Sequence, residues 1–422
     1  MNTNDTKSNF GKWGWSMILY CALSYYLAAA LSTDTLNFFP SIFTELRGWD
    51  ASAVDTMNTM AGVGGWFGVI AAFAFSILAA KMGSRVISVI GNILAGIICI
   101  LFATTQNFTF FLILIVLMVF VSGSVQLSVV PNNLMNIWFP KKKGLALGWA
   151  SMGLPLCTAT IVLVMNAFVS AQGPKGISTF YIAFGIVCFV FAAVSWFWCK
   201  NTPEEVGCTP DNQPIDLAAA NRLRVEQEEA AKKLTSVVLL KNRNTWLIGL
   251  GMGFMWMTTI GLVSNFVTRL CQTGVEPGFA VQMLTVAAIC GIVGSYIWGW
   301  LDQRFSTRTA SVLYGIWYLI ALLIMILMNG STPMVILAAF FVGVGIGGIG
   351  NLIPSMIGTC FGRFGFIQAN KIISPINTAV RCSALIIIGI IGTANLPTAY
   401  GVFLAFDLIG ILMVLFVKPA QE

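Results

Sequence analysis

Long apolar runs separated by short polar turns make up most of the chain. Each run reaches about 18 residues or more, the length that an α-helix needs to cross roughly 30 Å of hydrocarbon. Six runs precede residue 200 and six follow residue 243, so the sequence predicts an all-α membrane protein with 12 transmembrane helices. The expected spans are 13–37, 54–80, 86–105, 109–137, 144–169, 178–199, 244–268, 279–301, 309–329, 333–359, 365–392 and 397–417.

One long polar stretch divides the chain into two similar parts. The expected units are an N-terminal six-helix half at 1–199, a cytoplasmic linker at 200–243 and a C-terminal six-helix half at 244–422. Prolines at 203 and 210 indicate turns at the start of the linker. The charged, helix-favouring segment from Leu217 to Lys233 predicts a solvated amphipathic helix in preference to a regulatory site.

Short motifs recur at one spacing in the two parts. The sequence Lys-x-Gly-x-Arg follows the second span and Arg-x-Ser-x-Arg follows the eighth, 223 residues later, the same spacing that separates Pro131 from Pro354. An even number of spans in each half gives both halves one orientation, so the sequence predicts a parallel repeat. Transporters with such repeats bind solute between the halves and rock one half against the other. The predicted gating loops contain Lys81, Gly83, Arg85, Asp302, Arg304 and Arg308.

Composition and charge agree with this topology. Of the 422 residues, 57% are hydrophobic and only 9% are charged, against about 25% charged in soluble domains. All but five of the 23 lysines and arginines fall on one side if the N-terminus is inside; Arg47, Lys175 and Arg269 lie outside, and Lys371 and Arg381 lie within the eleventh span. This asymmetry predicts a multi-pass protein of the cell inner (plasma) membrane with both termini cytoplasmic. The net charge of +7 follows from it without a nucleic-acid partner.

Several kinds of chemistry are missing from the sequence. Histidine is absent, and the ten cysteines form no CxxC pair, so neither a metal site nor a cofactor is expected. The linker holds no Walker sequence, which argues against ATP-driven transport by this chain alone. Without histidine there is no Ser/His/Asp set, and the chain is not expected to be an enzyme.

Three motifs carry a family resemblance. The loop with Gly83 and Arg85, and its copy with Asp302 and Arg308, resembles the turn between spans two and three of the major facilitator superfamily, although Ala80 stands where that turn has Asp. The run Asn-Ile-Trp-Phe-Pro-Lys-Lys-Lys-Gly-Leu-Ala at 136–146 is similar to a turn of the oxalate/formate antiporter and monocarboxylate transporter relatives. The segments Pro-Glu-Glu-Val-Gly at 203–207 and Gly-Phe-Ile-Gln-Ala-Asn-Lys at 365–371 also resemble theirs.

The resemblance implies a role for Lys371 as the anion-binding lysine of the eleventh span. The oxalate transporter carries a second cation, an arginine in the eighth span just before a Trp-Gly pair. Here that pair begins at Trp298, and Ser295 occupies the matching position. Arg381 is a partial substitute, but its ten-residue separation from Lys371 amounts to about 15 Å of rise and about 80° of rotation. The resemblance therefore does not extend to the way in which a dianion would be held.

Four ionisable residues lie well inside apolar spans: Asp34, Lys371, Arg381 and Asp407. Each costs roughly 2.5–3.5 kcal/mol near the centre of a membrane helix unless it faces a partner or a cavity. Lys371 is either a carboxylate ligand or the partner of Asp34 or Asp407 in an ion pair. Asp34 is a proton carrier, a counter-charge to Arg381 or a helix-end residue. Asp407 is expected to be structural.

Uncharged polar and aromatic groups predict the other walls of the path. In the facilitator fold, helices one, four, seven and ten line it. The further candidate ligands are Tyr25, Tyr26, Gln126, Trp256, Asn265, Ser295, Trp298 and Asn351. An aromatic cage with one or two cations suits a small organic anion with an apolar body.

The leading hypothesis is a secondary active transporter of a small organic anion, a mono- or dicarboxylate. It would work by alternating access, as an antiporter, a proton symporter or a uniporter, and is expected to be a monomer in the lipid bilayer. One alternative is a carrier of a zwitterion or cation, such as a betaine or amine, that uses Asp34 and the aromatic residues. Another is a membrane sensor that transports nothing.

Overall fold

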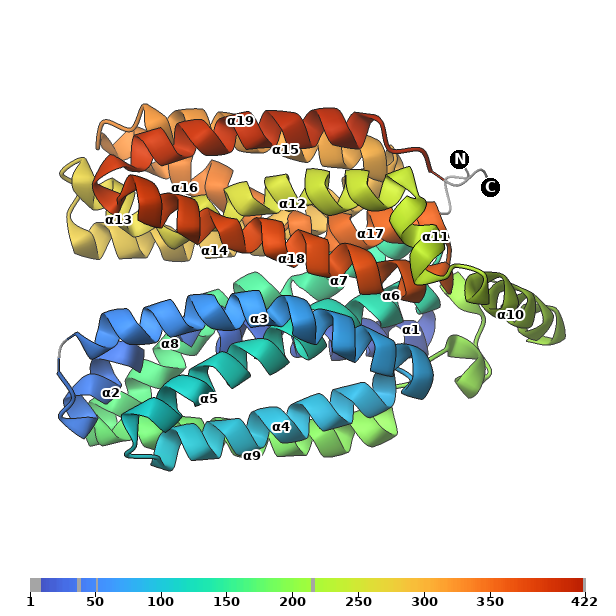
Figure 1. Cartoon of the computed structure of the whole chain (residues 1–422), viewed down its shortest axis with the longest axis horizontal. Coiled ribbons are helices and arrows are strands. Elements are labelled where there is room, and N and C mark those ends of the chain that lie inside the picture. The colour runs from blue at the N-terminus through green and yellow to red at the C-terminus, as the bar shows by residue number, and fades with distance from the viewer. Residues whose placement is uncertain (1–8, 36–38, 51, 214–216, 420–422) are drawn as a thin grey trace.

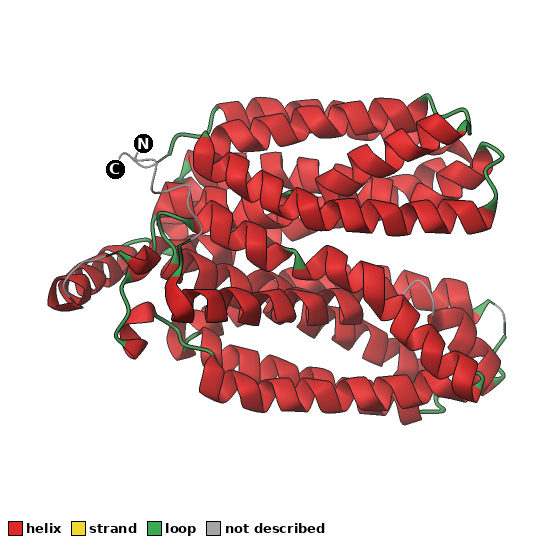
Figure 2. Cartoon of the chain, turned by 180° about the vertical axis from the view of Figure 1, so that it is seen from behind, coloured by secondary structure: helices red, strands yellow, loops and turns green. Residues whose placement is uncertain are grey.

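The computed structural model describes residues 9–35, 39–50, 52–213 and 217–419, and their regular structure is helical (Figure 2). The helices form two bundles that lie side by side (Figure 1). The end of the bundles that carries α10 (Leu217–Lys232) and α11 (Ser236–Lys241) is called the linker end below. The opposite end carries α2 (Phe39–Arg47) and α13 (Phe266–Gln272).

The first bundle holds the segments before the linker. They are α1 (Gly11–Ala29), the π-helix η1 (Ala30–Asp34), α3 (Ala53–Met82), α4 (Ser84–Thr104), α5 (Phe108–Val121), the π-helix η3 (Ser122–Val129), α6 (Val130–Trp138), α7 (Lys143–Ser151), α8 (Gly153–Gln172) and α9 (Lys175–Trp198). The short 3₁₀ turns η4 (Pro203–Val206) and η5 (Pro210–Asn212) begin the linker.

The second bundle repeats this order. Its segments are α12 (Arg243–Ser264), α14 (Pro277–Arg304), α15 (Thr307–Ile326), α16 (Thr332–Ile346), α17 (Ile349–Phe361), α18 (Gly365–Ile391), the 3₁₀ turn η6 (Thr393–Asn395) and α19 (Leu396–Leu415). Eleven helical segments of the described chain are long and apolar enough to cross a membrane. The one predicted span that is not among these eleven is the first in chain order. It consists of α1 with η1, which packs in the first bundle against α6, α7 and α8. Its predicted end at residue 37 lies outside the described residues.

Equivalent spans of the two bundles are interrupted near their prolines. In the fourth span, the π-helix η3 widens the backbone just before Pro131, the second residue of α6. In the tenth span, α16 ends and α17 begins at Gly347 and Gly348, a few residues before Pro354. Proline lacks the N–H of the regular ladder and crowds the preceding turn, which accounts for the break before Pro131. In the tenth span the helix continues through Pro354, and the break lies at the two glycines before it. The proline pair therefore marks spans that are interrupted in both halves, but by different local structures.

The two bundles approach each other closely where α7 crosses α14, because neither helix has bulky side chains there. A Cβ atom added to Gly299 would lie 2.5 Å from the Gly144 carbonyl oxygen and 2.8 Å from the Gly148 Cα atom. Gly148 in turn packs against the backbone of Ser295. Small residues four positions apart on both helices thus allow the two backbones to approach.

The linker contains the helix that its composition predicts. The expected helix from Leu217 to Lys233 is observed as α10, Leu217–Lys232. It projects beyond the bundles at the linker end (Figure 1). Its i,i+4 ion pair between Arg224 and Glu228, with N–O 2.9 Å, is partly exposed, as expected for a solvated helix.

Candidate functional site

A polar stripe on α18 is the starting point of the site. Asn370, Ser374, Asn377 and Arg381 follow one another at intervals of four, three and four residues, which places them within about 60° of one face. Asn370 and Asn377 are 3% and 1% exposed. The side-chain oxygen of Asn377 is enclosed and has no hydrogen-bond partner in the described chain. A row of buried polar groups on a membrane helix faces protein or solute rather than lipid.

Arg381 lies in this stripe without a counter-charge. Its guanidinium carbon lies 4.0 Å from the centre of the Trp256 ring on α12. Its Nε is enclosed and makes no hydrogen bond to a described residue. Apart from Trp256, the neighbouring thiol of Cys382 is the group that interacts with it. The three ion pairs found in the described chain do not include it.

Two arginines that are more deeply buried have hydrogen-bond partners, whereas the partly buried Arg381 has no counter-charge among the described residues. Arg269, 8% exposed, donates from Nε to the Met325 carbonyl at 3.0 Å and from an Nη to the Ile326 carbonyl at 3.1 Å. Arg363, 7% exposed, is paired with Glu204. A buried charge left alone is costly, so the stripe around Arg381 is suited to receive an anion.

The stripe borders the first bundle. The amide nitrogen of Asn370 donates to the Ser128 carbonyl in η3, with N–O 3.4 Å. Cys382, next to Arg381, approaches Gly65 of α3, where an added Cβ would lie 3.3 Å from its sulfur. Arg381 stands 16 residues into α18, about 24 Å from the end of that helix nearest the linker. The unpaired cation thus lies close to the boundary between the bundles and near the middle of its span.

Lys371 occupies a different face and depth of the same helix. It is rotated by about 100° from Asn370 and lies ten residues before Arg381. Its side chain is partly buried, and its ammonium group has no hydrogen bond or ion pair with a described residue. The alternative of an ion pair with Asp34 or Asp407 is therefore not what the described chain shows.

The predicted residues of the first span line the junction between η1, α1 and their neighbours in the first bundle. Tyr25 donates from its hydroxyl to Oδ1 of Asn132, with O–O 2.5 Å. The Tyr26 hydroxyl lies 2.9 Å from the Thr160 hydroxyl of α8. Asp34 accepts a hydrogen bond of 3.0 Å from the hydroxyl of Thr158, which is also in α8.

Gln126 belongs to a hydrogen-bonded network inside the first bundle. Its amide nitrogen donates to Oδ1 of Asn92 on α4, with N–O 2.5 Å, and it is 1% exposed. Asn92 in turn donates to the Ser88 carbonyl at 2.7 Å. The Tyr20 hydroxyl joins Ser88 at 2.5 Å and donates to Ser195 at 2.8 Å. The network ties α1, α4, α9 and η3 together, so Gln126 is occupied within the bundle.

Four further candidate ligands are engaged in packing within the second bundle. Ser295 is fully buried and donates to the Gly291 carbonyl at 3.0 Å. Trp298 donates from Nε1 to the Val344 carbonyl at 3.0 Å. Asn351 donates to the Ser295 carbonyl at 3.0 Å. Asn265 lies at the break between α12 and α13 and donates to the neighbouring Ser264 hydroxyl at 2.9 Å. Of the predicted lining residues of this bundle, the structure brings Trp256 together with Arg381.

The family model described as Major Facilitator Superfamily matches residues 17–387. The chain belongs to the Major Facilitator Superfamily. This facilitator is therefore a multi-pass membrane protein with the fold of that superfamily.

Individual relatives are distant. The inner membrane transport protein RhmT of Escherichia coli strain K12 is 22% identical over 277 residues, which make up 64% of this chain and 58% of RhmT. The proton:xylose symporter XylE, solved with 6-bromo-6-deoxy-D-glucose, superposes with a TM-score of 0.78 at 11% identity, over 98% of this chain and 97% of XylE. The E. coli fucose:proton symporter FucP superposes with a TM-score of 0.68 at 15% identity, over 96% and 98%. These likenesses show the fold that the facilitator shares with them.

A buried clamp closes the facilitator at the linker end. Arg363, between α17 and α18, pairs with Glu204 of the linker through two N–O contacts of 2.9 and 3.0 Å, with side chains 4% and 1% exposed. Its Nε donates to the Ile137 carbonyl at the end of α6, with N–O 2.7 Å. One arginine thus ties the second bundle to the first bundle and to the linker. Sequence reasoning assigned Arg363 only to the cytoplasmic loops, although Glu204 stands in a quoted motif.

Further contacts strengthen this closure. The Asp211 carboxylate accepts hydrogen bonds from the backbone N–H groups of Lys141 (3.1 and 3.0 Å) and Lys142 (2.8 Å). Gln303 donates to the Lys141 carbonyl at 2.8 Å, which joins α14 to the loop before α7. The hydrogen bonds that Gln303, Arg363 and Asn370 make between the bundles all lie nearer the linker end than Arg381 does.

The predicted gating loops hold the linker and the C-terminal segment. Gly83 adopts φ 84°, and a side chain there would meet Asn201 of the linker. Arg85 donates from its backbone N–H to Asn201 Oδ1 at 2.9 Å and lies 3.7 Å from Glu205. Lys81 and Arg304 are exposed.

In the copied loop of the second half, Asp302 is buried against Gly144 of α7 and retains one oxygen without a hydrogen-bond partner in the described chain. Arg308 donates to the Val417 carbonyl at 3.5 Å.

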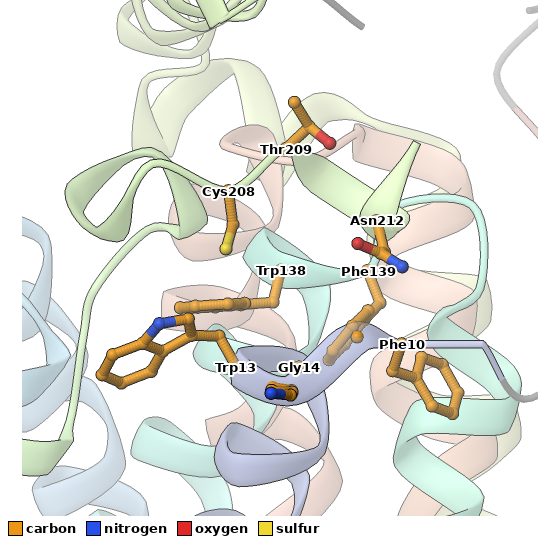
Figure 3. Close-up of a pocket in the computed structure, with 10 residues that line it drawn as sticks. Phe10, Trp13, Gly14, Trp138, Phe139, Cys208, Thr209 and Asn212 are labelled. Carbon is orange, nitrogen blue, oxygen red and sulfur yellow. The ribbon is translucent and has the colours of Figure 1, made fainter. Parts of the chain in front are cut away.

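A small cavity of about 170 Å³ lies at the linker end, where α1 begins (Figure 3). Its wall is largely aromatic, with Trp13, Trp138 and Phe139 around it and Cys208 of the linker pointing toward Trp138 (Figure 3). It contains neither Lys371 nor Arg381 and lies at the edge of the first bundle. It is therefore separate from the stripe that carries the unpaired cation.

Proposed function

We propose that this facilitator is a secondary active carrier of a small organic anion, and that Arg381 is its main anion-binding residue. The observation that carries the proposal is the partly buried guanidinium at the bundle boundary, stacked on Trp256, with its Nε enclosed and without a counter-charge in the described chain. A carboxylate would supply the missing charge through paired N–H···O bonds. Asn377 and Trp256 would then orient the polar and apolar parts of the solute.

Lys371 is the second anion-binding residue in the proposal. It lies nearer the linker end than Arg381, on an adjoining face of α18, and is likewise without an acidic partner among the described residues. A carboxylate that leaves Arg381 toward the linker end would meet Lys371 next. The resemblance of 365–371 to the oxalate/formate and monocarboxylate relatives supports an anion in this region. The oxalate transporter has a second cation, an arginine in the eighth span, where this chain has the buried Ser295. In the proposal, Arg381 supplies this second positive charge.

The contacts also favour one state of the transport cycle. The bias of basic residues supports a cytoplasmic location for the linker end and both termini in a cell inner membrane. With that orientation, the clamp and the glycine crossing would hold the facilitator in a state that is closed to the cytoplasm. Rocking of the bundles would have to break the Arg363 clamp before the solute leaves inward.

Thermal stabilisation of the purified protein tests the proposal. The panel contains lactate, oxalate, succinate, citrate and benzoate, with betaine and choline as the zwitterionic and cationic alternatives. A ligand at 100 times its Kd stabilises the folded state by about 2.7 kcal/mol, which raises the melting temperature. At least one carboxylate should stabilise the wild type and the Lys175→Gln control, whose side chain is exposed at the far end from the linker. The same carboxylate should lose its effect on Arg381→Gln and weaken on Lys371→Gln.

Other outcomes point elsewhere. Stabilisation by betaine or choline alone, retained in Arg381→Gln, would refute the anion assignment and favour Asp34 with the tyrosines of α1. Stabilisation without any flux of the same compound in proteoliposomes would leave a solute-binding sensor.

A further inference from the structure

A second unpaired charge site lies inside the second bundle, away from Arg381. Asp407 is the twelfth residue of α19, about 17 Å along that helix and thus near mid-membrane. Its side chain is 0% exposed. Both carboxyl oxygens are enclosed, and neither has a hydrogen-bond partner in the described chain. The sequence alone indicated a structural role, but a structural acid normally has a donor.

Hydroxyl groups from two neighbouring helices lie near this carboxyl group. Tyr314 and Tyr318 of α15 are fully buried, and both interact electrostatically with Asp407. The Tyr314 hydroxyl lies 2.8 Å from the Thr259 hydroxyl of α12. The Tyr318 hydroxyl is enclosed without a hydrogen-bond partner among the described residues. Buried hydroxyl groups of α12 and α15, both of which pack against α19, thus lie in this part of the bundle, but none makes a hydrogen bond to the Asp407 carboxyl group in the described chain.

Among the residues that the structure describes, no cation forms an ion pair with Asp407. Of the charged residues on the helices packed against α19, Arg243 of α12 lies over the Phe416 ring at the linker end, and Arg308 of α15 bonds the Val417 carbonyl there. Arg381 of α18 stacks on Trp256, and Lys371 lies still nearer the linker end. The remaining titratable groups of these helices in the described spans are Tyr400 and Cys382.

The form of Asp407 in this state follows from its surroundings. An ionised carboxylate without donors in a low-dielectric interior is too costly to persist, and such a group takes up a proton. A protonated Asp407 would need no counter-charge in this state, and its proton would be held out of contact with water. Asp34, the other acid considered for this role, has a donor in Thr158.

We propose that Asp407 is the proton-binding site that couples solute movement to a proton gradient. The proposal rests on the proposed anion transport and deepens it. The hydroxyls of Tyr314 and Thr259 connect the region of Asp407 to α12, where Thr259 lies one turn from Trp256 and hence from Arg381. The Asp407 oxygen accepts a proton from the outer side and loses it to the inner side after the bundles rock. One proton carried with one monocarboxylate moves no net charge.

Proteoliposomes separate transport from coupling. The probe is the member of the carboxylate panel that raises the wild-type melting temperature most, in radiolabelled form. Exchange of labelled for unlabelled probe at equal pH reports anion transport alone. Accumulation driven by an inside-alkaline gradient of one pH unit reports coupling, and reaches about tenfold for one proton per monocarboxylate.

Asp407→Asn should keep exchange but lose accumulation, ending near the equilibrium ratio of one. Asp407→Glu should restore part of the accumulation. Tyr400→Phe, which removes another buried hydroxyl of α19 without a hydrogen-bond partner in the described chain, should accumulate the probe like the wild type. As a check that needs no variant, probe entry into wild-type liposomes loaded with a pH dye should acidify the interior.

The result that overturns the inference is wild-type exchange without acidification, or full accumulation by Asp407→Asn. Absence of exchange in the wild type with every panel member would instead refute the proposed anion transport, and the coupling with it.

Discussion

Replacing Glu204 by Gln removes the charge of the linker-end clamp while keeping its size. In the structure, Arg363 makes two contacts with the Glu204 carboxylate, of 2.9 and 3.0 Å, and one with the Ile137 carbonyl, of 2.7 Å. In Glu204→Gln, one of the two contacts brings an amide N–H₂ against a guanidinium N–H, and the other becomes a bond to a neutral acceptor. The contact to Ile137 remains. The closed state loses its charge-assisted pair, and Arg363 is left buried without a counter-charge.

The magnitude follows from the burial of the pair. Removing one partner of a buried ion pair costs about 3–5 kcal/mol, and a hydrogen bond to a charged group contributes about 1.5–3 kcal/mol. Since one bond to a neutral acceptor remains, we expect the closed state to lose about 3 kcal/mol. At about 1.4 kcal/mol per factor of ten, the ratio of linker-end-closed to linker-end-open molecules should fall roughly 100-fold.

Hydrogen–deuterium exchange read by mass spectrometry measures this shift without labels on the ten native cysteines. Amides of α6, α7 and the start of α18 should exchange faster in Glu204→Gln than in the wild type, because these segments close the linker end. Glu228→Gln is the matched control, since it neutralises another glutamate in a 2.9 Å ion pair of the linker, with side chains 33% and 38% exposed. An exposed pair of this kind contributes at most about 1 kcal/mol.

The reasoning is refuted if Glu204→Gln and Glu228→Gln give the same exchange pattern in α6 and α7. It is also refuted if Glu204→Gln unfolds the protein as a whole, seen as faster exchange in all spans. A clamp that acts on the conformational equilibrium must change exchange at the linker end and leave the interiors of both bundles protected.

Two further changes test other parts of the structure. Gly299→Val would place a Cβ atom 2.5 Å from the Gly144 carbonyl oxygen. Because this side chain would force α7 and α14 apart, we expect exchange transport in proteoliposomes to slow at least tenfold. The control is Gly62→Ala, where an added Cβ meets nothing within 4 Å, and it should transport normally in the same assay. Gln126→Leu should lower the free energy of unfolding by about 1–3 kcal/mol, because it strands Asn92, without changing the solute Kd measured by titration calorimetry; a weakened Kd in a protein of normal stability would restore Gln126 to the solute site.

Much of the fold could be predicted because lipid makes the sequence pattern simple. Twelve apolar runs, one polar linker and an even number of spans in each half were sufficient to predict the facilitator architecture. The α10 helix ends within one residue of its prediction. The local structure of the interruptions in the fourth and tenth spans was not predicted. Pro131 and Pro354 indicated an event in the fourth and tenth spans, but hydropathy cannot distinguish the π-helix η3 from the glycine break between α16 and α17.

The candidate site was predicted less completely, because side-chain direction depends on packing. Arg381 and Lys371 stand out in any apolar span, but their relative importance depends on which shares a face with Asn370 and Asn377. Residue type and depth suggested Gln126, Ser295 and Asn351 as ligands, and all three are used in internal hydrogen bonds. The clamp was missed because Glu204 and Arg363 are 159 residues apart and neither lies in an apolar run.

The contacts of the linker are unevenly distributed along it. The residues that hold the loops of the bundles are Asn201, Glu204, Glu205 and Asp211, and all four lie between the end of α9 at Trp198 and the start of α10. The charged helix α10 follows them and projects outward. The clamp and the bonds to the loops therefore use only the part of the linker before α10. α10 adds one apolar contact at the linker end, where Ala231 packs with Ile137 and Phe364. The exposed positions of α10 are free to vary in sequence, whereas Ala231 and the short segment before α10 are tied to the closure of the two bundles.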